Sequence, residues 1–224
     1  VGDKQTLNLA MEMLSGAVTF QPQSPEGMQR VEASATLCRE VLNWEHGFLN
    51  VWNIPSQSQV LRVRATWRPY VVRQDLIQAL FNVYVTIRAG AAIRPPGAPG
   101  HNAPGNVRSL LLLLAGVTGR IFSNAAERSA FAQCLVEGML RVLGEPLKMS
   151  AEVQAAVMQQ QQQQGTAAQG NSDLEMSIAT AQESETSDLA VMILRLVLCT
   201  RFKGIALMPD FAGFLNQLRV ATTE

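Results

Sequence analysis

Apolar residues recur at intervals of three and four along most of the chain, the spacing that places them on one face of an α-helix. The pattern lapses in a Gly/Pro-rich stretch near residue 100 and in a Gln-rich stretch after residue 145. It predicts seven helices, at residues 3–19, 26–46, 72–92, 106–122, 127–143, 187–202 and 209–222. Helices 106–122 and 187–202 are apolar nearly all round, so neighbours must cover them on more than one side.

No strand pattern is present that would pair these helices into βαβ units, which leaves a helical bundle or an α-solenoid. The solenoid is favoured because each of its helical hairpins is covered by neighbours on both sides. We therefore predict an all-α fold, an α-solenoid of antiparallel helix pairs. The predicted pairs are 3–19 with 26–46, 72–92 with 106–122, and 127–143 with 187–202, with 209–222 unpaired.

Composition divides the chain into three parts. Residues 1–144 and 187–224 carry the helical pattern, whereas residues 145–186 contain no aromatic residue and include six consecutive glutamines at 159–164. Such a segment buries too little apolar surface to offset the entropy of ordering its backbone. We expect 145–186 to be a low-complexity, disordered insertion between the two helices of one repeat.

The balance of charges argues against two classes of binding partner, nucleic acids and anionic membranes. Among 224 residues, 18 basic side chains cancel 18 acidic ones, so no overall field attracts nucleic acid or an anionic membrane surface. No apolar run approaches the roughly 20 residues of a membrane span. Three cysteines without a CxxC pair favour a reducing compartment. Because the first residue is Val1, we expect the sequence to be an excerpt of a longer protein.

Residues that carry chemistry are sparse, and none forms a catalytic, cofactor or metal constellation. His46 and His101 are the only histidines, and neither lies at a ligand spacing from a Cys, Asp or Glu. The three cysteines, Cys38, Cys134 and Cys199, fall within apolar helical runs, where a thiol acts as a small hydrophobe. An enzymatic activity is therefore not expected.

Two groups of charged residues call for interpretation. Carboxylates cluster near the start of the sixth predicted helix, and we expect them to interact with the helix dipole: Glu183, Glu185 and Asp188. Arginines alternate with aromatic residues before the third helix: Arg62, Arg64, Trp67, Arg68, Tyr70 and Arg73. The second group could grip an acidic partner or stack on bases. We favour the alternative that it ties a connector onto adjacent helix ends.

Other arginines are scattered along the second helix of each predicted pair. They are Arg39, Arg108, Arg120, Arg195 and Arg201. Scattered charges suit a large protein partner touched at many points better than a small ligand held in one pocket. We therefore predict that these five arginines belong to a protein-binding face.

Three stretches of the sequence carry a resemblance to a known family. ValLeuAsnTrp at 41–44 precedes TrpArg at 67–68 and a helix reading LeuPheAsnValTyrValThrIleArg at 80–88. LeuLeuLeuLeuAlaGlyValThrGlyArgIlePhe at 111–122 is followed by PheAlaGlnCysLeuValGluGlyMetLeu at 131–140. Near the end, ArgPheLys is followed by a proline and PheAlaGlyPheLeu. In order and spacing these residues resemble the exportins of the karyopherin-β family, and the Gln-rich insertion departs from that pattern.

The resemblance implies HEAT-like antiparallel helix pairs in a nuclear export receptor. Such a receptor binds protein cargo together with Ran in its GTP form and releases the cargo on GTP hydrolysis. The implied partners are Ran-GTP, nuclear pore proteins, and cargo such as translation factor 5A or Smad-type proteins. The implied localisation is nucleus and cytoplasm, with shuttling through the pore, and no cofactor is implied. The alternative is a generic helical-repeat scaffold in the cytosol.

Overall fold

The computed structural model describes residues 2–19, 22, 24–49, 61, 63, 65–92, 94, 97–117, 121–145, 180 and 182–196. This part of the chain is helical and contains no strand, with one isolated parallel bridge between Leu61 and Val117. The predicted all-α fold is therefore confirmed for the described ranges. The predicted helix 209–222 and the glutamine run at 159–164 lie outside them.

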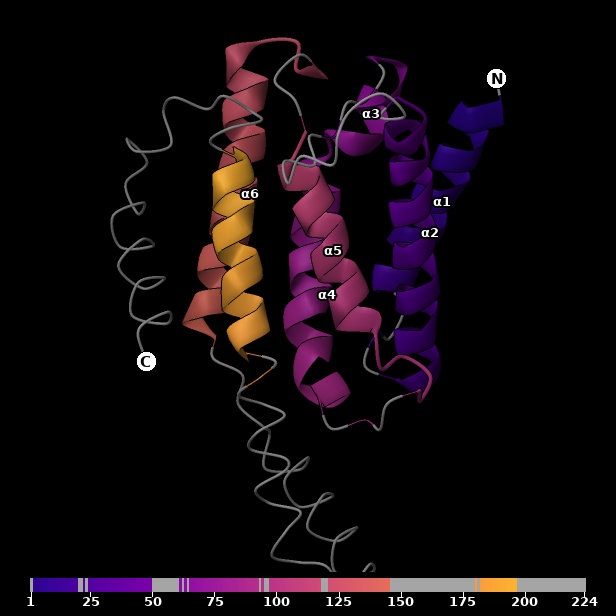
Figure 1. Cartoon of the computed structure of the whole chain (residues 1–224), viewed down its shortest axis with the longest axis vertical. Coiled ribbons are helices and arrows are strands. Elements are labelled where there is room, and N and C mark those ends of the chain that lie inside the picture. The colour runs from indigo at the N-terminus through magenta and orange to yellow at the C-terminus, as the bar shows by residue number, and fades with distance from the viewer. Residues whose placement is uncertain are drawn as a thin grey trace, which may run out of the picture.

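The order of the helices along the chain can be followed in Figure 1. They are α1 (Gly2–Thr19), α2 (Pro25–Leu49), the 3-10 turn η1 (Ala65–Trp67), α3 (Arg68–Val71), α4 (Gln74–Ala92), α5 (Ala103–Ala115) and α6 (Ala125–Gly144). A further helix spans residues 182–196 and is the orange helix of Figure 1.

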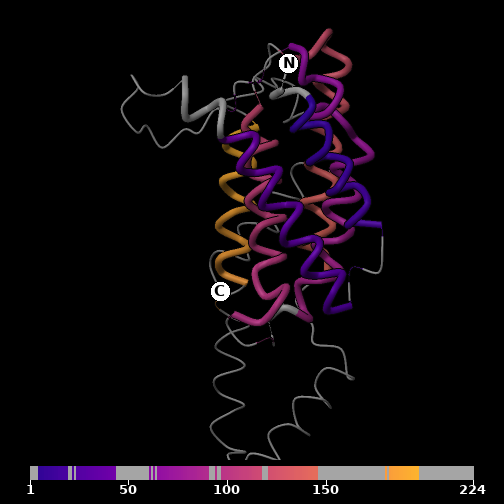
Figure 2. Tube along the Cα trace, turned by 90° about the vertical axis from the view of Figure 1, so that its right-hand side faces the viewer, coloured from indigo at the N-terminus to yellow at the C-terminus, as the bar shows by residue number. Residues whose placement is uncertain are grey.

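The long helices alternate in direction and form two layers. The first layer contains α1, α4 and α6, and the second contains α2, α5 and helix 182–196 (Figures 1 and 2). Within the layers, α1 packs on α4, α4 on α6, and α2 on α5, while α1–α2 and α4–α5 contacts join the layers. The predicted pairs α1–α2 and α4–α5 are thus in contact, and α2–α5 packing is the most extensive of all.

Local capping explains where two of the helices begin. Ser24 Oγ accepts a hydrogen bond from the Gly27 amide at 3.0 Å, and Pro25 occupies the first helical position of α2. At α6, Asn124 Oδ1 accepts from the Glu127 amide at 2.8 Å, and Glu127 Oε2 accepts from the Ser123 amide at 2.6 Å. The sequence signature of Asn124 followed by Glu127 is confirmed as a helix start.

Two predicted boundaries are wrong. The fourth predicted helix, 106–122, spans Ala103–Ala115 instead: Pro104 is accommodated in its first turn, and the chain leaves the helix at Gly116. Val117 then meets Leu61 in the isolated bridge. The sixth helix begins by residue 182 rather than 187, so the predicted insertion 145–186 ends too late, while residues 197–202 lie outside the described ranges.

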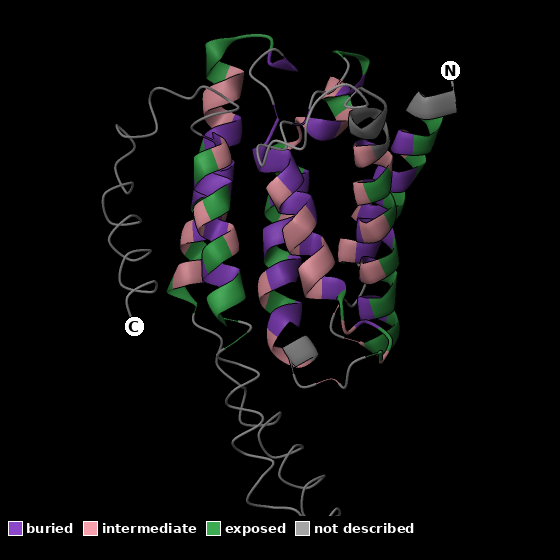
Figure 3. Ribbon diagram, viewed as in Figure 1, coloured by how far each residue is buried: buried purple, intermediate pink, exposed green. Residues whose placement is uncertain are grey.

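The core lies between the two layers, where the buried residues of each long helix meet (Figure 3). Helix α5 confirms the expectation of cover on more than one side, since Leu110, Leu111, Leu113 and Leu114 are buried and Leu112 is half-buried. This cover positions the second layer, from which most of the predicted site residues project.

Candidate functional site

The arginines predicted to form a protein-binding face are half-buried and bond within the chain. Arg39 Nη1 donates to Asn106 Oδ1 at 3.1 Å and so joins α2 to α5. Arg195 Nη1 donates to the Leu112 carbonyl at 2.7 Å and joins helix 182–196 to α5. Arg39, Arg108 and Arg195 are each intermediate in burial, and their place on a protein-binding face stays a prediction. Arg120 and Arg201 lie outside the described residues.

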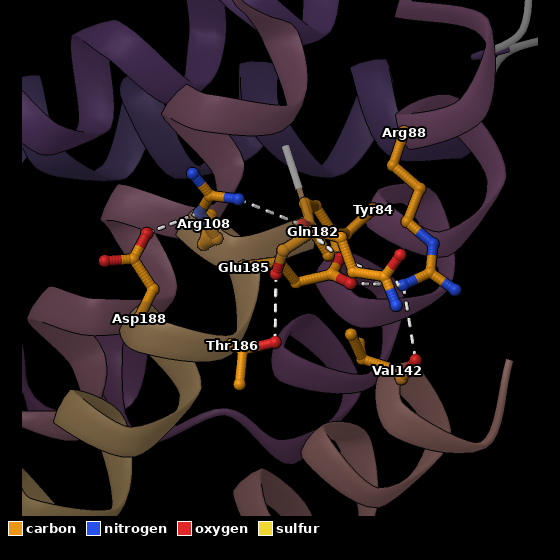
Figure 4. A network of polar contacts seen from close by, with 8 residues as sticks. All are labelled: Tyr84, Arg88, Arg108, Val142, Gln182, Glu185, Thr186 and Asp188. Atoms are coloured by element: carbon orange, nitrogen blue, oxygen red, sulfur yellow. Dashed lines mark hydrogen bonds and ion pairs between the residues drawn. The ribbon is translucent and has the colours of Figure 1, made fainter. Parts of the chain in front are cut away.

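The most developed polar site is a buried network where α4, α5, α6 and helix 182–196 meet (Figure 4). Its centre is the ion pair of Arg88 and Glu185, whose side chains are 5% and 8% exposed. Arg88 Nη1 donates to Glu185 Oε1 at 2.9 Å and to Oε2 at 3.0 Å. The same nitrogen donates to the Val142 carbonyl at 3.2 Å, which brings α6 into the network.

Tyr84 and Arg108 extend the network toward the surface. Tyr84 Oη donates to Glu185 Oε1 at 2.5 Å, and Arg108 Nη1 donates to Tyr84 Oη at 3.4 Å. Arg108 also forms an ion pair with Asp188, with Nε and Oδ2 2.5 Å apart, and donates from Nη2 to Ser184 Oγ at 2.8 Å. Two cations from α4 and α5 thus face two carboxylates from one helix.

The surroundings of Tyr84 and Arg108 shift the pKa of each. Burial, reinforced by the negative charge of Glu185, raises the pKa of Tyr84, so the phenol stays protonated and remains a donor. Burial alone would lower the pKa of Arg108, but contacts with Tyr84, Asp188 and Glu185 raise it on balance. The network is a charge-balanced anchor, and its geometry supports positioning rather than bond-making chemistry.

Sequence reasoning missed this site. Glu185 and Asp188, which were expected to interact with the helix dipole, also pair with arginines about 80 to 97 positions earlier in the chain. Two spacings were visible, because Tyr84 and Arg88 are four apart and Glu185 and Asp188 three apart, and each spacing places two side chains on one helix face. Nothing in the sequence said that those two faces meet.

The arginine–aromatic cluster before α4 serves the connector. Trp67 is 3% exposed in η1, and Arg68 pairs with Glu127 at the start of α6, with Nη2 and Oε1 2.6 Å apart. Arg73 pairs with Asp75 in the first turn of α4. These contacts favour the packing interpretation over a ligand-gripping one, while Arg62 and Arg64 lie outside the described residues.

The cysteines behave as the sequence analysis expected. Cys38 and Cys134 are free and buried, and burial raises their pKa values to about 12 and about 11. Cys199 lies outside the described ranges, as do the side-chain surroundings of His46. Among the residues that the structure describes, no three His, Cys, Asp or Glu side chains gather as metal ligands would. Within the same residues, no helix has the length and apolar character needed to cross a bilayer.

Comparison of the chain with protein-family models, with curated proteins and with solved structures found no match.

Proposed function

We propose that this chain is part of a nuclear export receptor of the karyopherin-β family, of the exportin-4 type. In this proposal its helices are HEAT-like repeats of an α-solenoid that binds protein cargo together with Ran-GTP. The receptor then carries the cargo from nucleus to cytoplasm through contacts with nuclear pore proteins. The proposed cargo is of the translation factor 5A or Smad type.

The observation that carries the proposal is the ordered resemblance between residues 41 and 140, which consists of helix-packing residues at family spacing. The layered packing supports it in outline. The first helix of each antiparallel pair packs on the first helix of the next, and α2 likewise packs on α5. Repeats that contact only their neighbours build an extended surface suited to a large protein partner.

The alternative function is a helical-repeat scaffold that binds proteins in the cytosol without Ran. The same layered helices support it, because they carry no requirement for a nucleotide-dependent partner. Among the residues that the structure describes, three arginines expected on the binding face bond within the chain: Arg39, Arg108 and Arg195.

Capture of Ran from solution separates the two. The full-length receptor containing this chain is incubated with immobilised Ran loaded with GTP or with GDP, with and without translation factor 5A. The transport proposal expects retention on Ran-GTP, increased by cargo, and none on Ran-GDP. Equal or absent retention in both nucleotide states would contradict the proposal and leave the scaffold function.

A further inference from the structure

A long segment connects α6 to helix 182–196, and its length does not determine where this helix packs on the stack. The segment between α6 and this helix covers residues 145–181. If the helix slipped by one turn, the length of this connecting segment would change by only about a tenth. The entropy of loop closure grows only with the logarithm of that length. The length of the connection therefore favours no register of packing over another.

The apolar surface of the helix is a poor guide as well. Four of its apolar residues are at most 8% exposed: Leu189, Met192, Ile193 and Leu196. Yet Val191 is 37% exposed and Leu194 is 56% exposed on the same helix. Since hydrophobic burial is non-directional, rotating the helix or sliding it by a turn would exchange one set of apolar side chains for another.

The polar contacts, in contrast, allow only one position. Glu185, Asp188 and Arg195 project to one side of the helix, because helical spacing places positions three and ten residues apart within about 80° of each other. Glu185 meets Arg88, Asp188 meets Arg108, and Arg195 meets the Leu112 carbonyl. The three contacts are spread over about 15 Å of helix axis.

A slip of one turn would move Glu185 by about 5.4 Å relative to α4. It would separate the 5%-exposed Arg88 guanidinium from the 8%-exposed Glu185 carboxylate and leave Arg88 with only the neutral Val142 carbonyl as a partner. Buried charges that lose their partner are strongly destabilising, whereas a matched pair adds little to stability over apolar side chains of similar volume. A buried pair of this kind therefore penalises wrong positions far more than it strengthens the right one.

We propose that the Arg88–Glu185 pair, with Asp188–Arg108 beside it, is a register device that gives helix 182–196 a single position on α4 and α5. The apolar residues supply the affinity of the helix for the stack, and the charges supply its specificity. This role is independent of the proposed transport function, because it concerns only how the chain completes its own fold.

The test measures position separately from stability. Spin labels are placed at two exposed positions, Ala33 on α2 and Ser187 on helix 182–196, in a chain carrying Cys199→Ser. Buried Cys38 and Cys134 stay unlabelled, which is checked by mass spectrometry. The distance distribution between the labels is recorded for the parent chain and for the variant Arg88→Met/Glu185→Leu, alongside a thermal melt. The matched control is Arg141→Met/Glu145→Leu, which removes an exposed ion pair on α6 together with the hydrogen bond from Arg141 to Asn82 on α4.

The parent and the control should each give one narrow distance. The Arg88→Met/Glu185→Leu variant should still melt cooperatively within a few degrees of the parent, but should show an additional distance or a distribution broadened by about 5 Å, one helical turn. A folded variant with the single parental distance would overturn the proposal, because apolar packing would then set the register. Loss of the cooperative melt would also overturn it, because the pair would then be needed for the fold itself.

Discussion

Gly138 of α6 lies against the ring of Phe81 on α4. A Cβ atom at this position would overlap the phenyl ring, and Phe81 is buried. We expect Gly138→Ala to destabilise the protein by about 1–3 kcal/mol, as overpacking of a filled core does. Denaturant unfolding of the variant measures the change.

Gly16 of α1 is the matched control for that substitution. It is exposed within a helix, and nothing lies within 4 Å of the position its Cβ would take. Gly16→Ala should therefore stabilise by about 0.5–1 kcal/mol through helix propensity alone. If Gly138→Ala behaved in the same way as Gly16→Ala, α4 and α6 would not pack as described.

Glu127 makes the stability of the α6 start depend on pH. The Arg68 guanidinium, with the Ser123 amide, holds the pKa of Glu127 below its ordinary value of 4.5. Its contribution to the free energy of unfolding is therefore fully present above pH 4.5 and is lost as the pH falls through the lower folded-state pKa. The stability difference between the parent and Glu127→Gln should shrink over that range when urea unfolding is followed from pH 6 to 3. A difference that stays constant with pH would rule out this pairing.

At the scale of elements, the Gln-rich segment and the helix that follows it should respond oppositely to deletion. Replacing residues 150–176 with a short Gly/Ser linker should barely move the melting temperature, because each halving of loop length changes the closure cost by only about 0.6 kcal/mol. Extending the replacement through residue 186 removes Glu185 and leaves Arg88 buried without its partner. That longer replacement should cost about 3–5 kcal/mol.

A collapse of the melt with the shorter replacement would show that residues 150–176 pack on the stack. Equal melting temperatures for both replacements would show that Glu185 does not contribute to the stability of the protein. The boundary between a dispensable segment and a required helix therefore falls before residue 180 in this account, rather than at residue 186 as composition alone predicted.

The sequence allowed the helices to be predicted because their apolar period and caps are local signals. Asn124 and Glu127 mark the start of α6 within four residues of chain. Asn124 Oδ1 accepts from the Glu127 amide as the motif requires, and the Glu127 carboxylate accepts from the Ser123 amide, one residue before the cap. The end of α5 was missed because the apolar period runs on through Ile121 and Phe122, which are buried although they lie outside the helix. The spacing of apolar residues indicates which positions are buried, and buried positions continue beyond the end of α5.

The polar network could not be predicted for a different reason. Its residues look like ordinary helix-surface charges until α4, α5 and helix 182–196 are brought together across roughly 100 positions of sequence. In the same arrangement, Arg108 and Arg195 form hydrogen bonds within the chain, although the sequence analysis predicted them on a binding face. Long-range pairing of this kind follows from helix packing, which a single sequence does not specify.

At the scale of the whole molecule, the layered helices contact their neighbours along the stack. The proposed export receptor would act by coupling two binding events. Binding of Ran-GTP and binding of cargo must then strengthen each other by the same factor, because coupling between two sites is reciprocal.

Measuring that coupling tests the proposed export function most directly. The dissociation constant of translation factor 5A from the full-length receptor is titrated with and without saturating Ran-GTP, and the dissociation constant of Ran-GTP is titrated with and without the cargo. We predict that each ligand lowers the dissociation constant of the other by one common factor of roughly 5- to 150-fold, the usual range for coupled sites. Unchanged cargo affinity in the presence of Ran-GTP would contradict an export receptor.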